Sequence, residues 1–289
     1  MEAIKIRGVK KEYKNFKLDL KELIVKKGYI TGFIGPNGSG KTTTIKAIMN
    51  MVKVDDGEIL VLNEDITKNV EIKEEISLVG DTSGFLEEAN LKCIKRSISR
   101  FYKNWDENLF KRIMNKFNIK EDLIYGKLSS GKKKQFELAI ALAKKPRVLI
   151  MDEPTANLDP IVRNEFLEVL QDQMENEDNT IFYSTHITSD LEKCADYIVF
   201  IYKGKVILYG EKDLILENHS IIKGKKDLLD IDTKKEFVSI KANEYNFEGL
   251  TDNKLKAFEI FGNEVIYEKS TLEDIMLYYT GEGIIWVEL

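Results

Sequence analysis

The stretch Gly35-Pro36-Asn37-Gly38-Ser39-Gly40-Lys41-Thr42 fits the pattern G-x-x-x-x-G-K-[ST] and decides the fold class of this chain. A compact apolar run, Tyr29 to Ile34, stands directly before it and indicates a buried strand. Apolar residues then recur at helical spacing, at Ile45, Ile48, Met49 and Val52. The predicted order is therefore strand, glycine loop, helix. A chance glycine turn is the alternative, and it does not account for this flanking order.

The loop has the chemistry of a polyphosphate site. Its glycines let backbone N–H groups turn inward, and the helix that begins near Lys41 adds the positive end of its dipole. The Lys41 ammonium is a point charge for the β and γ phosphates, and the Thr42 hydroxyl can ligate Mg²⁺. A triphosphate carries about four negative charges and needs many fixed donors. We expect Gly35 to Thr42, with Thr43 beside them, to bind such a ligand.

Two carboxylates follow a second apolar run. Asp152 and Glu153 come after Val148 to Met151, so they stand at the C-terminal end of a strand, where open parallel sheets bind ligands. Asp152 would hold Mg²⁺, directly or through water. Glu153 would orient or deprotonate the attacking water. A solvated strand end is the alternative for an Asp-Glu pair alone, and the glycine loop favours the catalytic interpretation.

Length and composition bound the remaining possibilities. The chain has 289 residues, which suits one large or two modest domains, and 43% of them are apolar, enough for a real core. The balance of 44 basic and 49 acidic residues argues against a general nucleic-acid backbone binder. Only Cys93 and Cys194 occur, which excludes a disulfide scaffold and favours a reducing compartment. With neither a membrane span nor a secretory signal in the sequence, we expect a cytoplasmic protein.

Strand and helix patterns alternate as far as about residue 210, which predicts a mainly parallel sheet. The first thirty residues alternate apolar and polar positions, as short half-exposed strands do. Residues 85–146 are expected to form a helical insert, in which Phe101 shares an apolar stripe with Leu91. The expected fold class is α/β: a P-loop NTPase core with an antiparallel β subdomain and a helical insert, plus a small C-terminal α/β domain.

The composition shifts after about residue 216, so we expect domains at 1–216 and 217–289. In the second, Ser270 and Glu273 match a capping box for a final helix. His219 stands in no motif and is expected at the surface. Residues 217–289 carry no chemical signature and could dimerise, regulate or brace the first domain.

Further motifs make the resemblance specific. The segment Leu128-Ser129-Ser130-Gly131-Lys132 resembles the signature motif of ABC-type ATPases. Ala156-Asn157-Leu158-Asp159, just after Asp152-Glu153-Pro154, is similar to their D-loop, and His186 after the next strand is similar to their switch histidine. These motifs occur in family order and cover about residues 1–210. The chain is therefore identified as resembling the ABC ATPase family, which implies ATP and Mg²⁺ as ligands.

The resemblance implies a site shared between two copies. In ABC ATPases two nucleotide-binding domains pack head to tail, and the signature of one covers the ATP at the P-loop of the other. Ser129 and the backbone around Ser130 and Gly131 would then donate to the γ-phosphate in trans. Lys132 belongs to the same segment, and Asp159 belongs to the D-loop beside it.

Other roles follow from the same resemblance. His186 would contact the γ-phosphate and sense its presence. Tyr13 lies where the family places an aromatic side chain that stacks on adenine, with Phe16 as a nearby competitor. Lys132 to Lys134 crowd a predicted helix N-terminus, where cations are unfavourable by roughly 0.3–1 kcal/mol each. A triphosphate nearby would offset that cost, and solvated lysines are the alternative for Lys133 and Lys134.

The sequence departs from the family pattern in two places. The family usually has Gln at the end of the strand before the helical insert, and here Asp81 occupies that place. Aspartate can still ligate Mg²⁺, but it adds a charge worth roughly 4 kcal/mol at about 4 Å and an effective dielectric near 20. Asp81 is therefore expected to be a metal ligand or a modulator of γ-phosphate binding. The signature also has Ser130 and Lys132 where Gly and Gln are commonest.

The resemblance implies the ATP-hydrolysing subunit of a bacterial ABC transporter. It would form a homodimer around two Mg·ATP and drive a separate transmembrane permease, at the inner face of the membrane. Asp81, Ser130 and the lysine-rich signature resemble those of bacterial exporters of the antibiotic- or peptide-resistance type. The alternative is a non-transport ABC ATPase acting on nucleic acid or ribosomes, although the single P-loop and the net charge of −5 weigh against it. A switch that binds ATP without hydrolysis is a third possibility, against which Glu153 argues.

Overall fold

A computed structural model describes residues 1–80, 84–156 and 158–281 of the chain. The contacts divide it into two compact units, Met1–Leu208 and Tyr209–Leu289. The predicted domain boundary after residue 216 falls inside helix α7 (Lys212–Asn218), so the second unit begins before that helix rather than within it. Among the described residues, no helix has the length and apolar character needed to cross a membrane.

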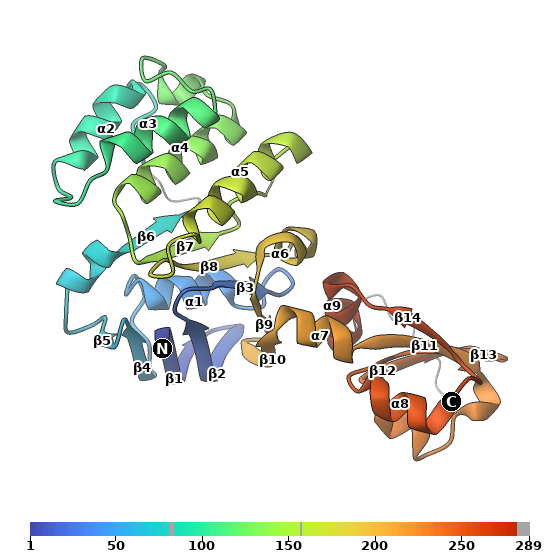
Figure 1. The fold of residues 1–289 in the computed structure, drawn as a ribbon. Coiled ribbons are helices and arrows are strands. Elements are labelled where there is room, and N and C mark those ends of the chain that lie inside the picture. The colour runs from blue at the N-terminus through green and yellow to red at the C-terminus, as the bar shows by residue number, and fades with distance from the viewer. Residues whose placement is uncertain (81–83, 157, 282–289) are drawn as a thin grey trace. The chain divides into compact units, whose positions relative to one another are not determined.

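A six-stranded sheet forms the centre of the first unit (Figure 1). Its order is β10-β9-β3-β8-β7-β6, and the pairs β3 with β8 and β9, β7 with β8, and β6 with β7 are parallel. The strands are β3 (Ile30–Ile34), β6 (Ile76–Val79), β7 (Val148–Asp152), β8 (Thr180–Thr185), β9 (Tyr197–Tyr202) and β10 (Lys205–Glu211). Because parallel strands end at the same edge, the loops after β3, β7 and β8 meet there.

A second, antiparallel sheet packs beside it, in the order β2-β1-β4-β5. It consists of β1 (Glu2–Tyr13), β2 (Phe16–Lys26), β4 (Asp56–Val61) and β5 (Glu64–Asp65). Helix α1 (Lys41–Ile48) lies between the two sheets, and its Ile45 and Ile48 share one buried cluster with Ile6 of β1 and Phe33 of β3. This cluster fixes the helix that follows the glycine loop.

Among the residues described between β6 and β7, three helices form the helical insert: α2 (Leu91–Ser99), α3 (Glu107–Lys116) and α4 (Ser130–Ala143). Each begins where a side chain caps its first turn, namely Asn90, Asp106 and Ser129. The prediction that Phe101 shares the apolar stripe of α2 is wrong. Helix α2 ends at Ser99, and the Phe101 side chain is 79% exposed. Helices α5 (Pro160–Gln173) and α6 (Thr188–Cys194) follow β7 and β8.

The second unit has its own sheet, in the order β12-β13-β11-β14. The strands are β11 (Ser220–Lys225), β12 (Ser239–Ala242), β13 (Asn246–Thr251) and β14 (Ile266–Lys269), with helices α7, α8 (Lys254–Phe261) and α9 (Leu272–Thr280). A separate core of Ile222, Phe247, Ala257, Phe261 and Val265 holds it together. Short 3-10 turns occur in this unit at Lys226–Leu228 and Thr233–Glu236, and in the first unit at Glu71–Glu75 and Tyr125–Lys127.

Two details of this unit differ from expectation. The capping box of α9 uses Thr271 and Asp274, one residue later than the predicted Ser270 and Glu273. His219 is buried, with 4% of its surface exposed, so its predicted surface position is wrong. Its imidazole lies between the Ile215 carbonyl, 2.8 Å from Nδ1, and the Tyr279 hydroxyl, 3.1 Å from Nε2.

Candidate active site

The glycine loop connects β3 to α1, as the sequence predicts. Gly38 and Gly40 have φ values of 78° and 113°, in the region that favours glycine. Gly35 has no room for a side chain, because a Cβ there would stand 2.3 Å from the Ile201 carbonyl oxygen. Buried Lys41 donates from Nζ to the Gly35 carbonyl at 2.7 Å. The ammonium is thus held against the loop, at the N-terminus of a helix, where anions bind favourably.

Asp152 ends β7 next to the first turn of α1. Burial raises the pKa of its carboxyl, and the nearby charge of Glu153 adds to the rise, although hydrogen bonds from the Thr42 and Ser184 hydroxyls work against it. The Ser184 Oγ lies 3.2 Å from Asp152 Oδ1. A partly desolvated carboxylate beside two hydroxyls is a set of hard oxygen donors, which suits Mg²⁺ held by few protein ligands and substrate phosphates. The predicted pair Thr42 and Asp152 therefore fits this cation, and Ser184 joins it.

Glu153 lies at the point where three loops converge. Its Oε1 is 3.4 Å from Lys41 Nζ, and its Oε2 is 2.8 Å from His186 Nδ1. The backbone of Glu153 has a φ of 50°, unusual for a residue with a side chain, and its N–H donates to the Ser184 carbonyl at 2.9 Å. That bond ties the carboxylate residue to β8, whose end carries His186. The structure thus brings together Lys41, Glu153 and His186, as the sequence predicts.

The signature segment begins α4. Ser129 is the N-cap, and its Oγ accepts a hydrogen bond from the Lys132 amide at 3.3 Å. Ser129 and Ser130 are exposed. The Lys132 ammonium donates to the Phe117 carbonyl, and Lys133 pairs with Glu87 at 2.9 Å, so both amines have partners in their own chain.

The signature segment lies beside the D-loop in the same chain. A Cβ at Gly131 would stand 3.3 Å from Val162 Cγ1 and 3.6 Å from Leu158 Cδ2. Asp159 caps α5, and its Oδ1 accepts from the amides of Ile161 and Val162 at 3.1 Å each. The two segments therefore lie against each other at Gly131, Leu158 and Val162, and Asp159 holds its own helix.

The aromatic candidates for adenine stacking have different surroundings. Tyr13 ends β1 and is 42% exposed, with its ring centroid 6.4 Å from that of Phe16. Phe16 packs on the glycine loop, since a Cβ at Gly40 would meet its ring at 2.9 Å. Tyr13 is therefore the more exposed of the two aromatic side chains. Asp81, predicted as a metal ligand, lies outside the described residues.

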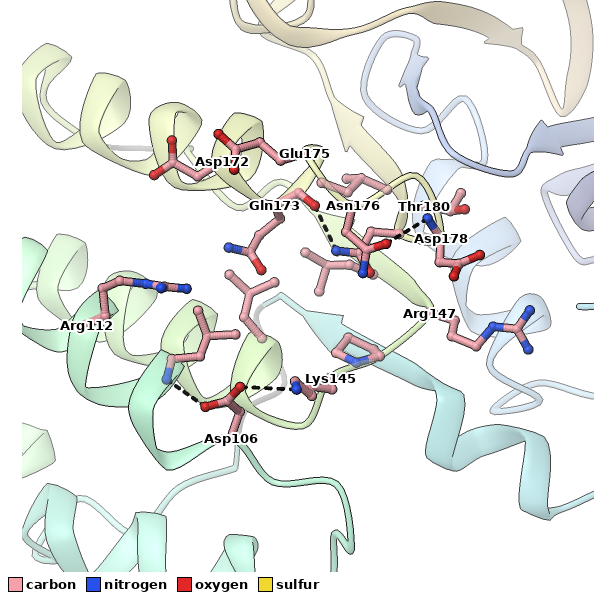
Figure 2. A pocket seen from close by; sticks show the side chains of 16 residues that line it. Asp106, Arg112, Lys145, Arg147, Asp172, Gln173, Glu175, Asn176, Asp178 and Thr180 are labelled. Atoms are coloured by element: carbon pink, nitrogen blue, oxygen red, sulfur yellow. Dashed lines mark hydrogen bonds and ion pairs between the residues drawn. The ribbon is translucent and has the colours of Figure 1, made fainter.

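A pocket of about 570 Å³ lies elsewhere in the first unit (Figure 2). It is lined by Leu149, Thr180 and Ile181, which belong to the starts of β7 and β8, whereas Asp152 and Thr185 stand at the ends of these strands. Its rim is polar, with Asp106 and Lys145 paired at 3.2 Å. The pocket is therefore separate from the candidate active site.

Sequence reasoning missed some of the residues that surround the site. Ser184 has no motif of its own and is found only from its place at the end of β8. Thr155, Tyr183 and Asp190 form a buried hydrogen-bonded cluster, and Thr155 and Asp190 follow Glu153 and His186 closely in sequence. The available signal is the position of Thr155 between the Asp152-Glu153-Pro154 segment and the D-loop, and of Asp190 in the helix after His186.

The fold and the convergent groups define a P-loop nucleotide-binding protein of the α/β class. Residues 18–156 match the family described as ABC transporter. A solved nucleotide-free ATP-binding cassette from an ABC transporter superposes with a TM-score of 0.62 at 27% identity, covering 73% of this chain and 92% of that one. The antiparallel subdomain and helical insert accompany the P-loop core, so the predicted fold class is confirmed.

Similar curated proteins agree with this class. The bacitracin transport ATP-binding protein BcrA of Bacillus licheniformis is 33% identical over 210 residues, or 71% of this chain and 68% of the relative. The lantibiotic transport ATP-binding protein SrtF of Streptococcus pyogenes is 34% identical over 219 residues, which are 73% of this chain and 91% of that protein. The match to YtrB of Bacillus subtilis, at 31% identity, spans 61% of that protein. The chain belongs to the ATP-binding proteins of ABC transporters, a family of ATPases.

Proposed function

We propose that this chain is the ATP-hydrolysing subunit of a bacterial exporter and that Glu153 is the base for the attacking water. The observation that carries the proposal is the convergence of Lys41, Glu153 and His186, with contacts of 3.4 Å and 2.8 Å. The Lys41 ammonium would bind the β and γ phosphates, and His186 would contact the γ-phosphate. Glu153 stands between them, where a water in line with the γ-phosphate would be deprotonated.

Each group has a defined task in this arrangement. The amides of Gly35 to Lys41 would bind phosphate oxygens, and Tyr13 would stack on adenine. Thr42 and Asp152 would hold Mg²⁺, which when bound neutralises charge on the β and γ phosphates. Glu153 is tied to both Lys41 and His186 in the described structure, so a γ-phosphate that takes over these two contacts would release its carboxylate for the water.

The proposed working unit is a homodimer that encloses two ATP molecules. The exposed hydroxyls of Ser129 and Ser130, at the N-terminus of α4, would donate to the γ-phosphate bound by the other copy. The proximity of Gly131 to Leu158 and Val162 supports this, because the signature and the D-loop would reach the partner as one surface. Lys132 and Asp159 would support that surface through the contacts they make in their own chain.

Transport by a separate permease is proposed from the relatives. Two of them are named as ATP-binding proteins of bacitracin and lantibiotic transport, and each covers more than 70% of this chain. By the same reasoning we place the subunit at the inner face of the membrane, bound to a membrane-spanning partner. Net acidity gives no support to the alternative of a nucleic-acid or ribosome partner.

The test is purification of the tagged full chain from detergent-solubilised membranes of its own host, followed by phosphate-release measurements with ATP and Mg²⁺. We expect a membrane-spanning protein in stoichiometric amount and hydrolysis that requires Mg²⁺. Recovery of ribosomes or nucleic acid in place of a membrane protein would favour the alternative. ATP binding without phosphate release would show a binding-only switch.

A further inference from the structure

A buried carboxylate lies in the helix that follows His186. Asp190 of α6 is 1% exposed, and its Oδ2 accepts hydrogen bonds from Thr155 Oγ1 at 2.6 Å and from Tyr183 Oη at 3.1 Å. The two hydroxyls are 2.7 Å apart, and both residues are fully buried. Burial, together with the nearby charge of Asp190, raises the pKa of Tyr183 well above its usual value, so Tyr183 stays a donor. Asp190 therefore joins the loop after β7, the strand β8 and helix α6.

One side of this cluster is incomplete among the described residues. Arg163 Nε of α5 lies 3.8 Å from Asp190 Oδ1, and both atoms are buried without a hydrogen-bond partner. A charge-assisted hydrogen bond between these groups has a length of about 2.7–2.9 Å, so about 1 Å of approach would complete it. The Arg163 side chain is 25% exposed, but its Nε and the Asp190 Oδ1 are both buried, and buried polar atoms without a hydrogen bond are costly. Arg163 and Asp190 are therefore close enough to form this hydrogen bond after a small movement.

The cluster connects the two groups proposed for catalysis. Thr155 is two residues beyond Glu153, and Asp190 is four residues beyond His186. Arg163 Nη2 donates to the Leu158 carbonyl of the D-loop at 3.3 Å. A movement of the Arg163 side chain would therefore be coupled to the position of the D-loop. The cluster thus joins the loop after the base, the helix after the switch histidine, and the segment proposed to face the partner.

We propose that Asp190 is a positioning residue for hydrolysis, which ties the loop after Glu153 to the helix after His186 and closes on Arg163 in the hydrolytic arrangement. This inference rests on the proposed roles of Glu153 and His186. Asp190 touches none of the reacting atoms, so it acts through these two groups. Its loss should lower turnover and leave ATP binding nearly unchanged, because Lys41 and the glycine loop are anchored elsewhere.

The test compares Asp190→Asn and Arg163→Gln in the full chain, each assayed for kcat, KM for ATP, nucleotide affinity and thermal unfolding. We expect each to lower kcat about tenfold or more while KM changes less than about twofold. The double variant should lose about as much as either single variant, because both remove one contact. Asp172→Asn is the matched control: this carboxylate is on α5 like Arg163, pairs with Lys116 at 3.0 Å and is exposed.

Two further measurements keep the outcomes apart. If Asp190→Asn does not fold, Tyr183→Phe and Thr155→Val each remove one hydroxyl from the cluster, and they should reduce kcat with unchanged KM. Lower unfolding midpoints with wild-type kcat would overturn the positioning role and leave a purely structural one. Glu153→Gln is measured in parallel. If this variant retains turnover, the proposed function is wrong. If it loses turnover while Asp190→Asn stays fully active, only the present inference is wrong.

Discussion

At the scale of single residues, the candidate active site depends on one carboxylate with two cationic or ionisable neighbours. Glu153 contacts both Lys41 and His186, and its backbone adopts a conformation that few residues with side chains accept. Strain of this kind persists where the surroundings fix it, and here the hydrogen bond from the Glu153 N–H to the Ser184 carbonyl does so. The backbone that carries this carboxylate is thus fixed to β8.

Glu153→Gln should preserve ATP binding and reduce turnover by about 10²–10⁴, or roughly 3–5 kcal/mol of barrier. The amide has the shape of the carboxylate and can still contact His186, but it cannot accept a proton from water. Phosphate release and nucleotide affinity, measured on the same preparation, check both halves. Turnover at the wild-type rate would remove Glu153 from its role as base.

Lys41→Ala should weaken ATP binding by at least about tenfold, or 1.4 kcal/mol, because a charge-assisted contact to phosphate is lost. Lys46→Ala is the matched control: Lys46 lies on the same helix and is exposed. Calorimetry with ATP and Mg²⁺ measures the difference. Equal affinities for the two variants would mean that the glycine loop is not the phosphate site.

Asp152→Asn should stabilise the nucleotide-free protein at neutral pH while abolishing its Mg²⁺-dependent hydrolysis. The pKa of the Asp152 carboxyl is raised by burial, so the folded protein binds this proton more tightly than the unfolded chain does. Folding stability from this group is therefore present below the ordinary pKa of 3.8 and is lost as the pH rises through the folded-state value. Melting temperatures of variant and wild type should differ most near pH 7 and converge toward pH 4. A variant less stable at pH 7 would contradict this sign.

At the scale of elements, the sequence predicts most where a pattern constrains the backbone. The glycine loop between strand and helix, and the carboxylates after an apolar strand, place Lys41 and Asp152 at one sheet edge because parallel strands end together. The α9 cap shows the limit. Ser270 with Glu273 and Thr271 with Asp274 both fit a capping box, and only the helix register selects the second pair. A shift of one residue is invisible to the pattern.

Burial set by distant partners could not be predicted either. Asp190 becomes a buried acceptor because Thr155 and Tyr183, 35 and 7 residues away, supply hydroxyls. His219 becomes buried because Tyr279, 60 residues later, reaches its Nε2. Neither residue type alone carries that information, since aspartate is mostly exposed and histidine is intermediate in burial.

His219 should make the second unit sensitive to acid. Burial lowers the pKa of its imidazole, although the Ile215 carbonyl opposes the shift, so in mild acid the unfolded chain takes up the proton more readily than the folded one. The contribution to stability is present above the ordinary value of 6.5 and is lost as the pH falls toward the folded-state pKa. Burial raises the pKa of Tyr279 to about 12, so its hydroxyl remains a donor to the neutral ring throughout.

Amide hydrogen exchange of β11 at pH 7.5 and pH 5.5, corrected for intrinsic rates, measures this effect. We expect protection to fall at pH 5.5 in the wild type and to change less in His219→Phe. His186→Ala is the control, because His186 is the other histidine of the chain and lies in the first unit. If the wild-type second unit is equally protected at both pH values, protonation of His219 does not destabilise it.

At the scale of the whole molecule, the central proposal is that two copies share each ATP. It predicts that a copy defective in the P-loop and a copy defective in the signature repair each other. Ser130→Glu is suited to the second role: Ser130 is exposed in the first turn of α4, where an acidic side chain favours the helix, yet its carboxylate would repel a triphosphate on the partner. Lys41→Ala supplies the first defect.

Each variant alone should hydrolyse ATP at a small fraction of the wild-type rate. Random pairing of an equimolar mixture makes half of the dimers mixed, and each mixed dimer has one intact site of two, so about a quarter of wild-type activity should return. Native mass spectrometry, with one copy tagged, verifies that mixed dimers form in ATP and Mg²⁺. If mixed dimers are present and phosphate release stays at the level of the separate variants, the P-loop and the signature do not act on one ATP from opposite copies. If the Ser130→Glu protein alone keeps full activity, the signature of this chain does not face the triphosphate.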